Sequence, residues 1–373
     1  MKHSDYDPND FAGDDAGCIN EAIRAAAAAG GTARIGRRRP DGAADRDYWL
    51  IDSAILLPGG ANVVFENCRV KRSDRCRDNF LRSANCIPGA AEVRPLSGIR
   101  VRGEGRVIFE GADRPRATGD AATTLYTAAS GVEGGYVGGL QDGVWRSYGT
   151  DAGVAGECQT GDWRNIGVLF AHVSDFSLAG LTFVNTHGWA VLLEHCSSGQ
   201  VRSLAFDSSG YLMVDKHRGR ILTQDGLDIR HGCHDIVVDT LTGTTGDDVL
   251  ALTALPSPPR ACGLEGWTEF CGGCADPRND RSDDIFNIVV RNVVASSDPD
   301  AHTVRLLNNG RIRLHHVIHV VPARLALGLD DLAQALDGGR GGDGAGAVLA
   351  RPERGDGLLD VERDGRQQMN GVD

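Results

Sequence analysis

The sequence predicts a right-handed parallel β-helix, preceded by one helix that caps its N-terminal end. Two observations carry this prediction: short apolar segments recur at a regular period, and the composition is rich in turns but poor in large core rings. The chain has 373 residues, of which 50 are glycine and only 6% are aromatic. This balance is typical of stacked short strands and not of a helical bundle.

One helix is expected near the N-terminus. Asp14 and Asp15 precede apolar residues at helical spacing, and Gly30 and Gly31 follow them. Acidic residues at the start and glycine at the end are the signals of a capped helix. Because the first coil of a solenoid has an unpaired strand edge, we expect this helix to cover it.

The remaining elements are expected to be the short strands of a repeating coil. Val201 follows Phe176 by 25 residues, and Ile312 follows Ile288 by 24. Periods of 20–50 residues indicate a solenoid. The units contain alternating β-branched residues, so each coil should stack its strands in parallel at a spacing of about 4.8 Å. The units are residues 98–103, 175–183, 199–206, 234–241, 286–294 and 311–317.

Residues 1–320 are expected to form one β-helix catalytic domain, interrupted by two insertions. The first, residues 111–164, is a long loop whose aromatic residues either stack on sugar rings or pin the loop to the solenoid. The second, residues 253–284, contains three cysteines, which could be reduced thiols, form a disulfide or bind a metal. A zinc site needs about four ligands, so no metal is assigned. The repeat is absent from residues 321–373. This segment is expected to be either a short helix with a disordered tail or an altered end of the solenoid.

Charge and hydropathy exclude several partners. The net charge of −12 argues against nucleic acid, whose phosphates require basic side chains. No apolar run approaches the ~20 residues of a membrane span. Residues 1–10 lack the apolar stretch of a signal peptide, which predicts a cytoplasmic protein, or a secreted one whose signal has been removed. A monomer or small homo-oligomer is expected.

Three aspartates form the candidate catalytic site. Asp225 precedes Asp247 by 22 residues, about one coil, so Asp225, Asp247 and Asp248 should meet on neighbouring coils. Like charges at this distance raise at least one pKa. Such a cluster suits acid/base catalysis or a divalent metal, and glycoside hydrolysis needs one protonated and one ionised carboxyl group. The alternative is that these aspartates simply occupy exposed turns.

The stretch from about residue 165 to 314 resembles the polygalacturonase family, glycoside hydrolase family 28. Residues 223–226 (TQDG) match the first family motif in part, residues 246–248 (GDD) match the second, and Asn185-Thr186 before Trp189 is also similar. The opening helix and its glycine pair resemble the wider superfamily of pectin-lyase-like parallel β-helices.

The resemblance implies roles for the aspartates. Asp247 would protonate the leaving oxygen, while Asp225 and Asp248 would hold and deprotonate the attacking water. Such a reaction inverts the anomeric centre and needs carboxyl separations of about 6.5–9.5 Å. It requires a carbohydrate substrate and no cofactor.

The chain departs from the family at two motifs. Residues 251–284 contain no histidine, where the family has Gly-His-Gly, and Leu307 replaces the lysine of the family's Arg-Ile-Lys motif. The resemblance therefore implies a substrate other than plain polygalacturonate. Arg305 retains the cation of the motif, and His302 is expected beside it as a second part of a substrate clamp, or alternatively as a turn residue.

Four further residues are candidates for substrate binding. Trp189 is expected to form a stacking platform, with His187 beside it and Gln224 within the first motif. Lys216 lies in a basic loop before that motif and would bind an anionic sugar, unless the loop is merely solvated.

Two other functions remain open. The first is a β-helix polysaccharide lyase or a fructosyltransferase, of which a lyase would need calcium and release an unsaturated product. The second is a non-catalytic glycan-binding or tailspike-like β-helix, which trimer formation would support.

Overall fold

The computed structural model describes twelve segments of the chain, and all statements below refer to them. They are residues 5–40, 46–76, 78–87, 93–113, 140–141, 144–145, 166–214, 217–220, 224–254, 281–299, 301–308 and 314–320.

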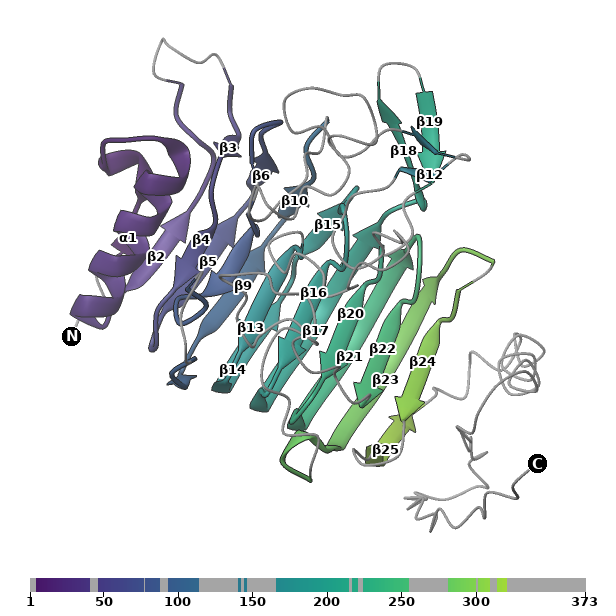
Figure 1. Cartoon of the computed structure of the whole chain (residues 1–373). Coiled ribbons are helices and arrows are strands. Elements are labelled where there is room, and N and C mark those ends of the chain that lie inside the picture. The colour runs from purple at the N-terminus through teal and green to yellow at the C-terminus, as the bar shows by residue number, and fades with distance from the viewer. Residues whose placement is uncertain are drawn as a thin grey trace, which may run out of the picture.

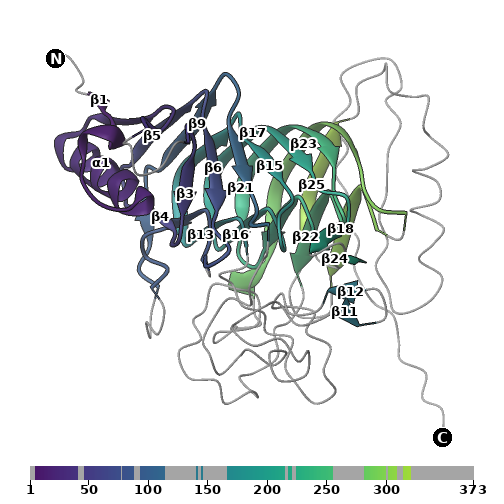
Figure 2. The ribbon, with the colours of Figure 1, turned by 90° about the horizontal axis from the view of Figure 1, so that it is seen from above.

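The chain folds as a right-handed parallel β-helix, as predicted. Figures 1 and 2 show its coils stacked from the N-terminal helix towards β25. A 14-stranded sheet and a 7-stranded sheet, here called sheet A and sheet B, form its walls, and every pairing within them is parallel. Parallel strands joined by crossovers are right-handed in nearly all proteins.

The bounds of the strands are as follows. Sheet A contains β1 (Asp5–Tyr6), β2 (Thr32–Ile35), β3 (Trp49–Ile51), β5 (Asn62–Glu66), β6 (Arg69–Arg72), β8 (Leu96–Ser97), β9 (Arg100–Glu104), β10 (Ile108–Glu110), β14 (Val173–Ala179), β15 (Thr182–Val184), β17 (Ser197–Asp207), β21 (His234–Thr244), β23 (Ile285–Ser296) and β25 (Leu314–Val320). Sheet B contains β4 (Ile55–Leu57), β7 (Leu81–Ser83), β13 (Val168–Ala171), β16 (Val191–Glu194), β20 (Leu227–Arg230), β22 (Leu250–Ala254) and β24 (Val304–Asn308). A small third sheet contains β11 (Leu140–Gln141), β12 (Val144–Trp145), β18 (Tyr211–Val214) and β19 (His217–Arg220).

The core lies between sheets A and B and consists of side chains that repeat at the same position on each coil. In sheet A, five aligned residues are buried: Val101, Leu178, Val201, Val238 and Val290. Beside them lies a row of contacting phenylalanine rings with centroids 5.0–6.1 Å apart, of which the first pair meets edge to face and the others stack: Phe65, Phe109, Phe183 and Phe206. The period found in the sequence is therefore the period of this core.

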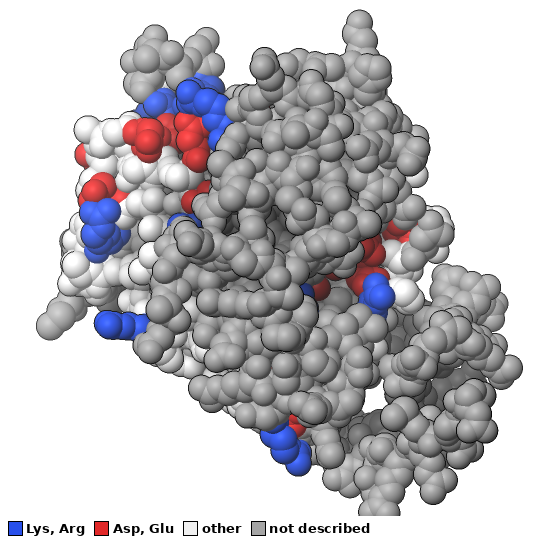
Figure 3. All heavy atoms as spheres, viewed as in Figure 1, with Lys and Arg blue, Asp and Glu red and all other residues white. Residues whose placement is uncertain are grey.

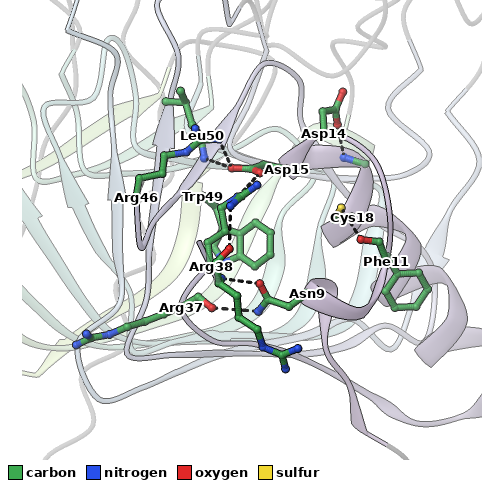
Figure 4. A network of polar contacts seen from close by, with 12 residues as sticks. Asn9, Phe11, Asp14, Asp15, Cys18, Arg37, Arg38, Arg46, Trp49 and Leu50 are labelled. Carbon is green, nitrogen blue, oxygen red and sulfur yellow. Dashed lines mark hydrogen bonds and ion pairs between the residues drawn. The ribbon is translucent and has the colours of Figure 1, made fainter. Parts of the chain in front are cut away.

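The predicted cap is helix α1 (Asp15–Ala29), which follows the short 3-10 helix η1 (Pro8–Asp10). Its N-cap Asp14 accepts a hydrogen bond from the backbone of Gly17, and Gly30 ends it in the left-handed conformation. Figure 4 shows the buried Asp15 carboxylate, which accepts hydrogen bonds from Arg38, Arg46 and the backbone N–H of Leu50. This carboxylate ties the helix to the first coil.

A row of left-handed residues forms the turn that leaves sheet B. His172 (φ 51°) and His195 (φ 49°) adopt this conformation on successive coils, and their rings stack 4.6 Å apart. Gly232 (φ 66°) continues the row, and a Cβ there would lie 2.3 Å from Nδ1 of His195. Glycine is therefore required at this position, because any side chain would collide with the histidine ring.

Several sequence expectations fall largely outside the described residues. The loop at 111–164 is described only at 111–113, 140–141 and 144–145, where β12 pairs with β19. Residues 255–280, with the three loop cysteines, and the tail at 321–373 also lie outside. Within the described part of the chain, no helix is long and apolar enough to cross a membrane.

Candidate functional site

The candidate site lies where the chain enters the strands of sheet B. Backbone hydrogen bonds connect the equivalent entry points of successive coils. They run from Ala190 N to Asp225 O (2.8 Å), from Gly226 N to Asp248 O (2.8 Å) and from Val249 N to His302 O (2.9 Å). Trp189, Asp225, Asp248 and His302 therefore occupy one equivalent position on four successive coils, spaced by about 4.8 Å per coil.

A second row begins three residues further along each strand, on the outer face of sheet B. The register pairs Leu192 with Asp228, Asp228 with Ala251, and Ala251 with Arg305. Asp228 is a fourth carboxyl group of the site, and the sequence analysis missed it. Its signal was present: in Leu227-Asp228-Ile229, a charged residue alternates with two buried core residues.

Gln224 brings the two aspartate motifs together. Its backbone carbonyl accepts hydrogen bonds from the backbone N–H groups of Gly246 (3.2 Å) and Asp247 (3.3 Å). Its side chain is fully buried; the amide nitrogen donates to the carbonyl of Thr186, and Oε1 accepts from Gly210 N at 2.8 Å. Gln224 therefore fixes the backbone next to Asp225 against the backbone at Asp247.

Asp248 is a buried carboxylate held by the two predicted clamp residues. Oδ1 accepts a hydrogen bond from the backbone N–H of His302 (2.9 Å) and lies 3.1 Å from Nδ1 of its ring. Oδ2 accepts from Nη1 of Arg305 at 3.2 Å. The side chain of Asp248 is 3% exposed, whereas those of Arg305 and His302 are 41% and 42% exposed. The clamp residues therefore reach solvent and hold Asp248 beneath them.

Asp247 lies nearer the surface and is only partly buried. Burial raises the pKa of Asp247, and the neighbouring charge of Asp248 raises it further, whereas Arg305 opposes the shift. A carboxyl group with a raised pKa next to a held carboxylate is the environment that a general acid requires.

Asp228 is a second carboxyl group of the cluster with a raised pKa. Its side chain is 2% exposed and lies between the apolar Leu192 and Ala251 in the sheet register. Burial raises the pKa of Asp228 well above its ordinary value, with Asp248 and Asp247 adding to the shift and Arg230 opposing it.

Trp189 and His187 lie on the coil before Asp225. Trp189 is partly buried, and the guanidinium carbon of Arg230 lies 5.0 Å from its ring centroid. His187 is 3% exposed, and its Nε2 lies 3.1 Å from the carbonyl oxygen of Ala112. Burial lowers the pKa of His187 to about 3, and the charges of Arg72 and Lys71 contribute, so His187 is a neutral residue beneath the surface.

The remaining sequence expectations concern Lys216, a metal site and the cysteines. Lys216 lies outside the described residues. No group of three or more metal-ligating side chains occurs within the described segments. Six buried cysteines there are free thiols: Cys18, Cys68, Cys76, Cys86, Cys196 and Cys233. On the face in Figure 3, acidic side chains gather beside a basic one near the right edge.

Comparison of the sequence with protein families found no match, and neither did comparison with curated proteins. Two solved structures are similar at low identity. One is PfbA, a surface adhesin of Streptococcus pneumoniae, with 10% identity and a TM-score of 0.41 over 85% of this chain and 72% of that one. The other is a family 28 exopolygalacturonase of Yersinia enterocolitica, with 11% identity and a TM-score of 0.43 over 86% of this chain and 56% of that one.

Proposed function

We propose that this protein is a glycoside hydrolase that cleaves a glycosidic bond in an oligosaccharide or polysaccharide with its aspartate cluster. The observation that carries the proposal is the difference between two adjacent carboxyl groups. Asp247 is partly exposed and has a raised pKa, while Asp248 is buried and accepts hydrogen bonds from Arg305 and His302. Two carboxyl groups with opposed environments are what acid/base cleavage of a glycoside requires.

In the proposed reaction, Asp247 donates its proton to the leaving glycosidic oxygen. Asp225 and Asp248 hold the attacking water, and Asp225 accepts its proton as the oxygen bonds to the anomeric carbon. Attack from the face opposite the leaving group inverts the anomeric centre.

The proposed substrate-binding surface extends from Trp189 to Arg305. Trp189 occupies the entry position one coil before Asp225, and its ring would stack on the neighbouring sugar ring. Arg305 and His302 would contact the sugar at the opposite end, since their side chains are 41% and 42% exposed beside Asp248. His187 and Gln224 would support this surface from beneath. Lys216, which lies outside the described residues, would bind an anionic sugar.

Product release from a panel of plant and bacterial oligosaccharides tests the proposal. Reducing ends should appear with at least one substrate, and proton NMR at early times should show the product with the anomeric configuration opposite to that of the substrate. An unsaturated product that requires calcium would instead indicate a lyase. Glycan binding without any product would contradict the hydrolase and favour a binding module.

A further inference from the structure

The core of the β-helix is less well covered at its C-terminal end than along its length. Leu250 and Leu252 of β22 are fully buried. Their partners on the next coil, Val304 and Leu306 of β24, are only partly buried, although both pack against the same core. Among the described residues β24 pairs with β22 alone, so it is the last strand of sheet B. The apolar side of this strand therefore lies at the open end of the core.

The second half of β23 contributes to the same end of the core. Within the described segments, β25 pairs with β23 no further than Arg291. Beyond that point Val293 and Ala295 are only partly buried against the core, whereas Leu241, the partner of Val293 on the previous coil, is fully buried. We call the four partly buried residues the end face: Val293, Ala295, Val304 and Leu306. An apolar end of a solenoid needs a capping element to cover it.

The N-terminal end shows how this protein covers its core. Helix α1 lies across the first coil (Figure 1), and its buried residues Ile19, Ile23 and Ala26 join the main core cluster. They recur at positions i, i+4 and i+7, which places them on one face of the helix. Gly30 ends the helix and Gly31 follows it. An apolar stripe followed by a glycine pair is therefore the capping element at this end.

The sequence after β25 contains a segment with the same pattern. Leu329, Leu332 and Leu336 recur at i, i+3 and i+7, and Gly338 and Gly339 follow them. Two aspartates lie between the first two leucines, where acidic residues favour the start of a helix. This segment lies outside the described residues, so the pattern is one of sequence alone. It predicts an amphipathic helix whose leucine stripe needs an apolar surface.

We propose that residues 329–337 form a helix that docks its leucine stripe on the end face and closes the C-terminal end of the core. Residues 321–328 connect β25 to this segment, and eight extended residues span up to about 25 Å. A helix about 10 Å in diameter matches the spacing of about 10 Å between packed sheets. The tether gives the segment an effective concentration on the order of 1 mM at the end face, which favours it over a second copy of the chain.

The docked helix would steady the strand that carries one of the clamp residues. Arg305 lies between Val304 and Leu306 on β24 and donates a hydrogen bond to Asp248. Successive residues of a strand point to opposite faces, so a helix on Val304 and Leu306 holds β24 without covering Arg305. The consequence for substrate binding rests on the proposed function, whereas the docking itself does not.

Hydrogen exchange of the 373-residue chain tests the docking without any substrate. Leu332→Asp places a charge in the proposed contact, so the amides of β24 should exchange about tenfold or more faster. The amides of β2, at the other end of the solenoid, should be unchanged. Leu359→Asp is the matched control, because it makes the same change outside the leucine stripe, and it should alter neither strand. Unchanged exchange of β24 in Leu332→Asp, or equal acceleration by both variants, would overturn the proposal.

A double-mutant cycle on the same exchange rates tests the contact itself. Leu306→Ala and Leu332→Ala remove the two sides of one contact, so together they should accelerate β24 by clearly less than the product of their separate effects. Val294→Ala, at a position that is 50% exposed, is the control and should combine with Leu332→Ala multiplicatively. Multiplicative effects of the first pair would contradict the contact. The milder Leu306→Val serves the same cycle if the alanine variant does not fold.

Dilution distinguishes the tethered segment from a second copy of the chain. An intramolecular cap should leave the exchange of β24 in the wild type independent of protein concentration, because no partner is lost. Faster exchange of β24 on dilution, together with the mass of a dimer in light scattering, would show that two chains cover each other's end faces and would overturn the proposal.

Discussion

Arg305 donates a hydrogen bond from Nη1 to Oδ2 of Asp248 at 3.2 Å, across two neighbouring coils of the β-helix. The arginine is 41% exposed and the aspartate 3%, so the ion pair joins a surface cation to a buried carboxylate. Losing the cation would leave a buried charge with fewer donors, which costs more than losing an exposed pair.

Arg305→Ala should therefore lower the free energy of unfolding by about 1–3 kcal/mol, as expected for a hydrogen bond to a charged group. Asp248→Asn should cost a similar amount, and the double variant should cost clearly less than the two together, because they remove the same contact. Urea unfolding measures all three. Arg106→Ala, at an exposed position, is the control and should change stability by less than about 0.5 kcal/mol; additive effects of the pair would contradict the coupling.

Asp228→Asn should make the protein more stable at neutral pH. The folded-state pKa of Asp228 is raised, while the unfolded value is about 3.9. Between these two values the folded state binds more protons, so stability falls as pH rises through this window. Asparagine cannot ionise, so the variant should lack this decline and gain on the order of 1 kcal/mol or more at neutral pH. Chemical unfolding at several pH values measures the difference, and parallel curves for both proteins would refute it.

The ion pair of Glu194 and His231 should give stability the opposite pH dependence to that of Asp228. Both side chains are 3% exposed, and Nδ1 of His231 lies 3.4 Å from Oε1 of Glu194. Burial alone would raise the pKa of Glu194, but the hydrogen bond and charge of His231, with His195 and Arg230, outweigh it and lower the pKa. This contribution to stability is present above the unfolded value of about 4.3 and is lost as pH falls through the folded value.

His231→Leu should therefore destabilise the protein by about 3–5 kcal/mol, because it leaves a buried carboxylate without its partner. Combining it with Glu194→Gln, which removes the charge, should recover part of the loss. Thermal and urea unfolding report both effects. A double variant no more stable than His231→Leu alone would show that the pair is not the source of the cost.

Asp15 should be essential to the N-terminal cap. It accepts hydrogen bonds from Arg38 (2.7 Å), Arg46 (3.0 Å) and the backbone of Leu50 (2.7 Å) while 5% exposed. Asp15→Ala should cost about 3 kcal/mol or more, and the neighbouring N-cap variant Asp14→Ala only about 1 kcal/mol. Hydrogen exchange should show faster exchange in α1 and β2 for Asp15→Ala, and equal effects of the two variants would contradict this assignment.

The coil period explains why much of this structure could be predicted from sequence. A separation of 22 residues placed Asp225 and Asp247 on neighbouring coils, and backbone hydrogen bonds from Gly226 N to Asp248 O and from Asp247 N to Gln224 O do join the two motifs on neighbouring coils. The acidic start and glycine end of α1 likewise predicted the helix bounds to within about one residue. Both predictions depend on local patterns, which a repeating fold converts directly into position.

Contacts between residues far apart in the sequence could not be predicted in this way. His187 is buried against Ala112, which lies 75 residues earlier in the chain, and no pattern around His187 indicates that contact. The burial of Gln224 depends on Gly210 and Thr186, from two other parts of the chain. Asp228 differs, because its alternation with Leu227 and Ile229 was visible, yet only the burial of its carboxyl group distinguishes it from a solvent-facing strand residue.

The most direct test of the central claim is the turnover of a cleaved oligosaccharide by the wild type, Asp247→Asn and the control Asp175→Asn, at matched protein concentration and with folding checked by circular dichroism. If Asp247 is the general acid, its variant should lose about 10²–10⁴-fold in kcat, while the exposed control, 62% accessible at its side chain, should retain wild-type turnover. Equal turnover by wild type and Asp247→Asn would contradict the proposed catalytic role of the aspartate cluster.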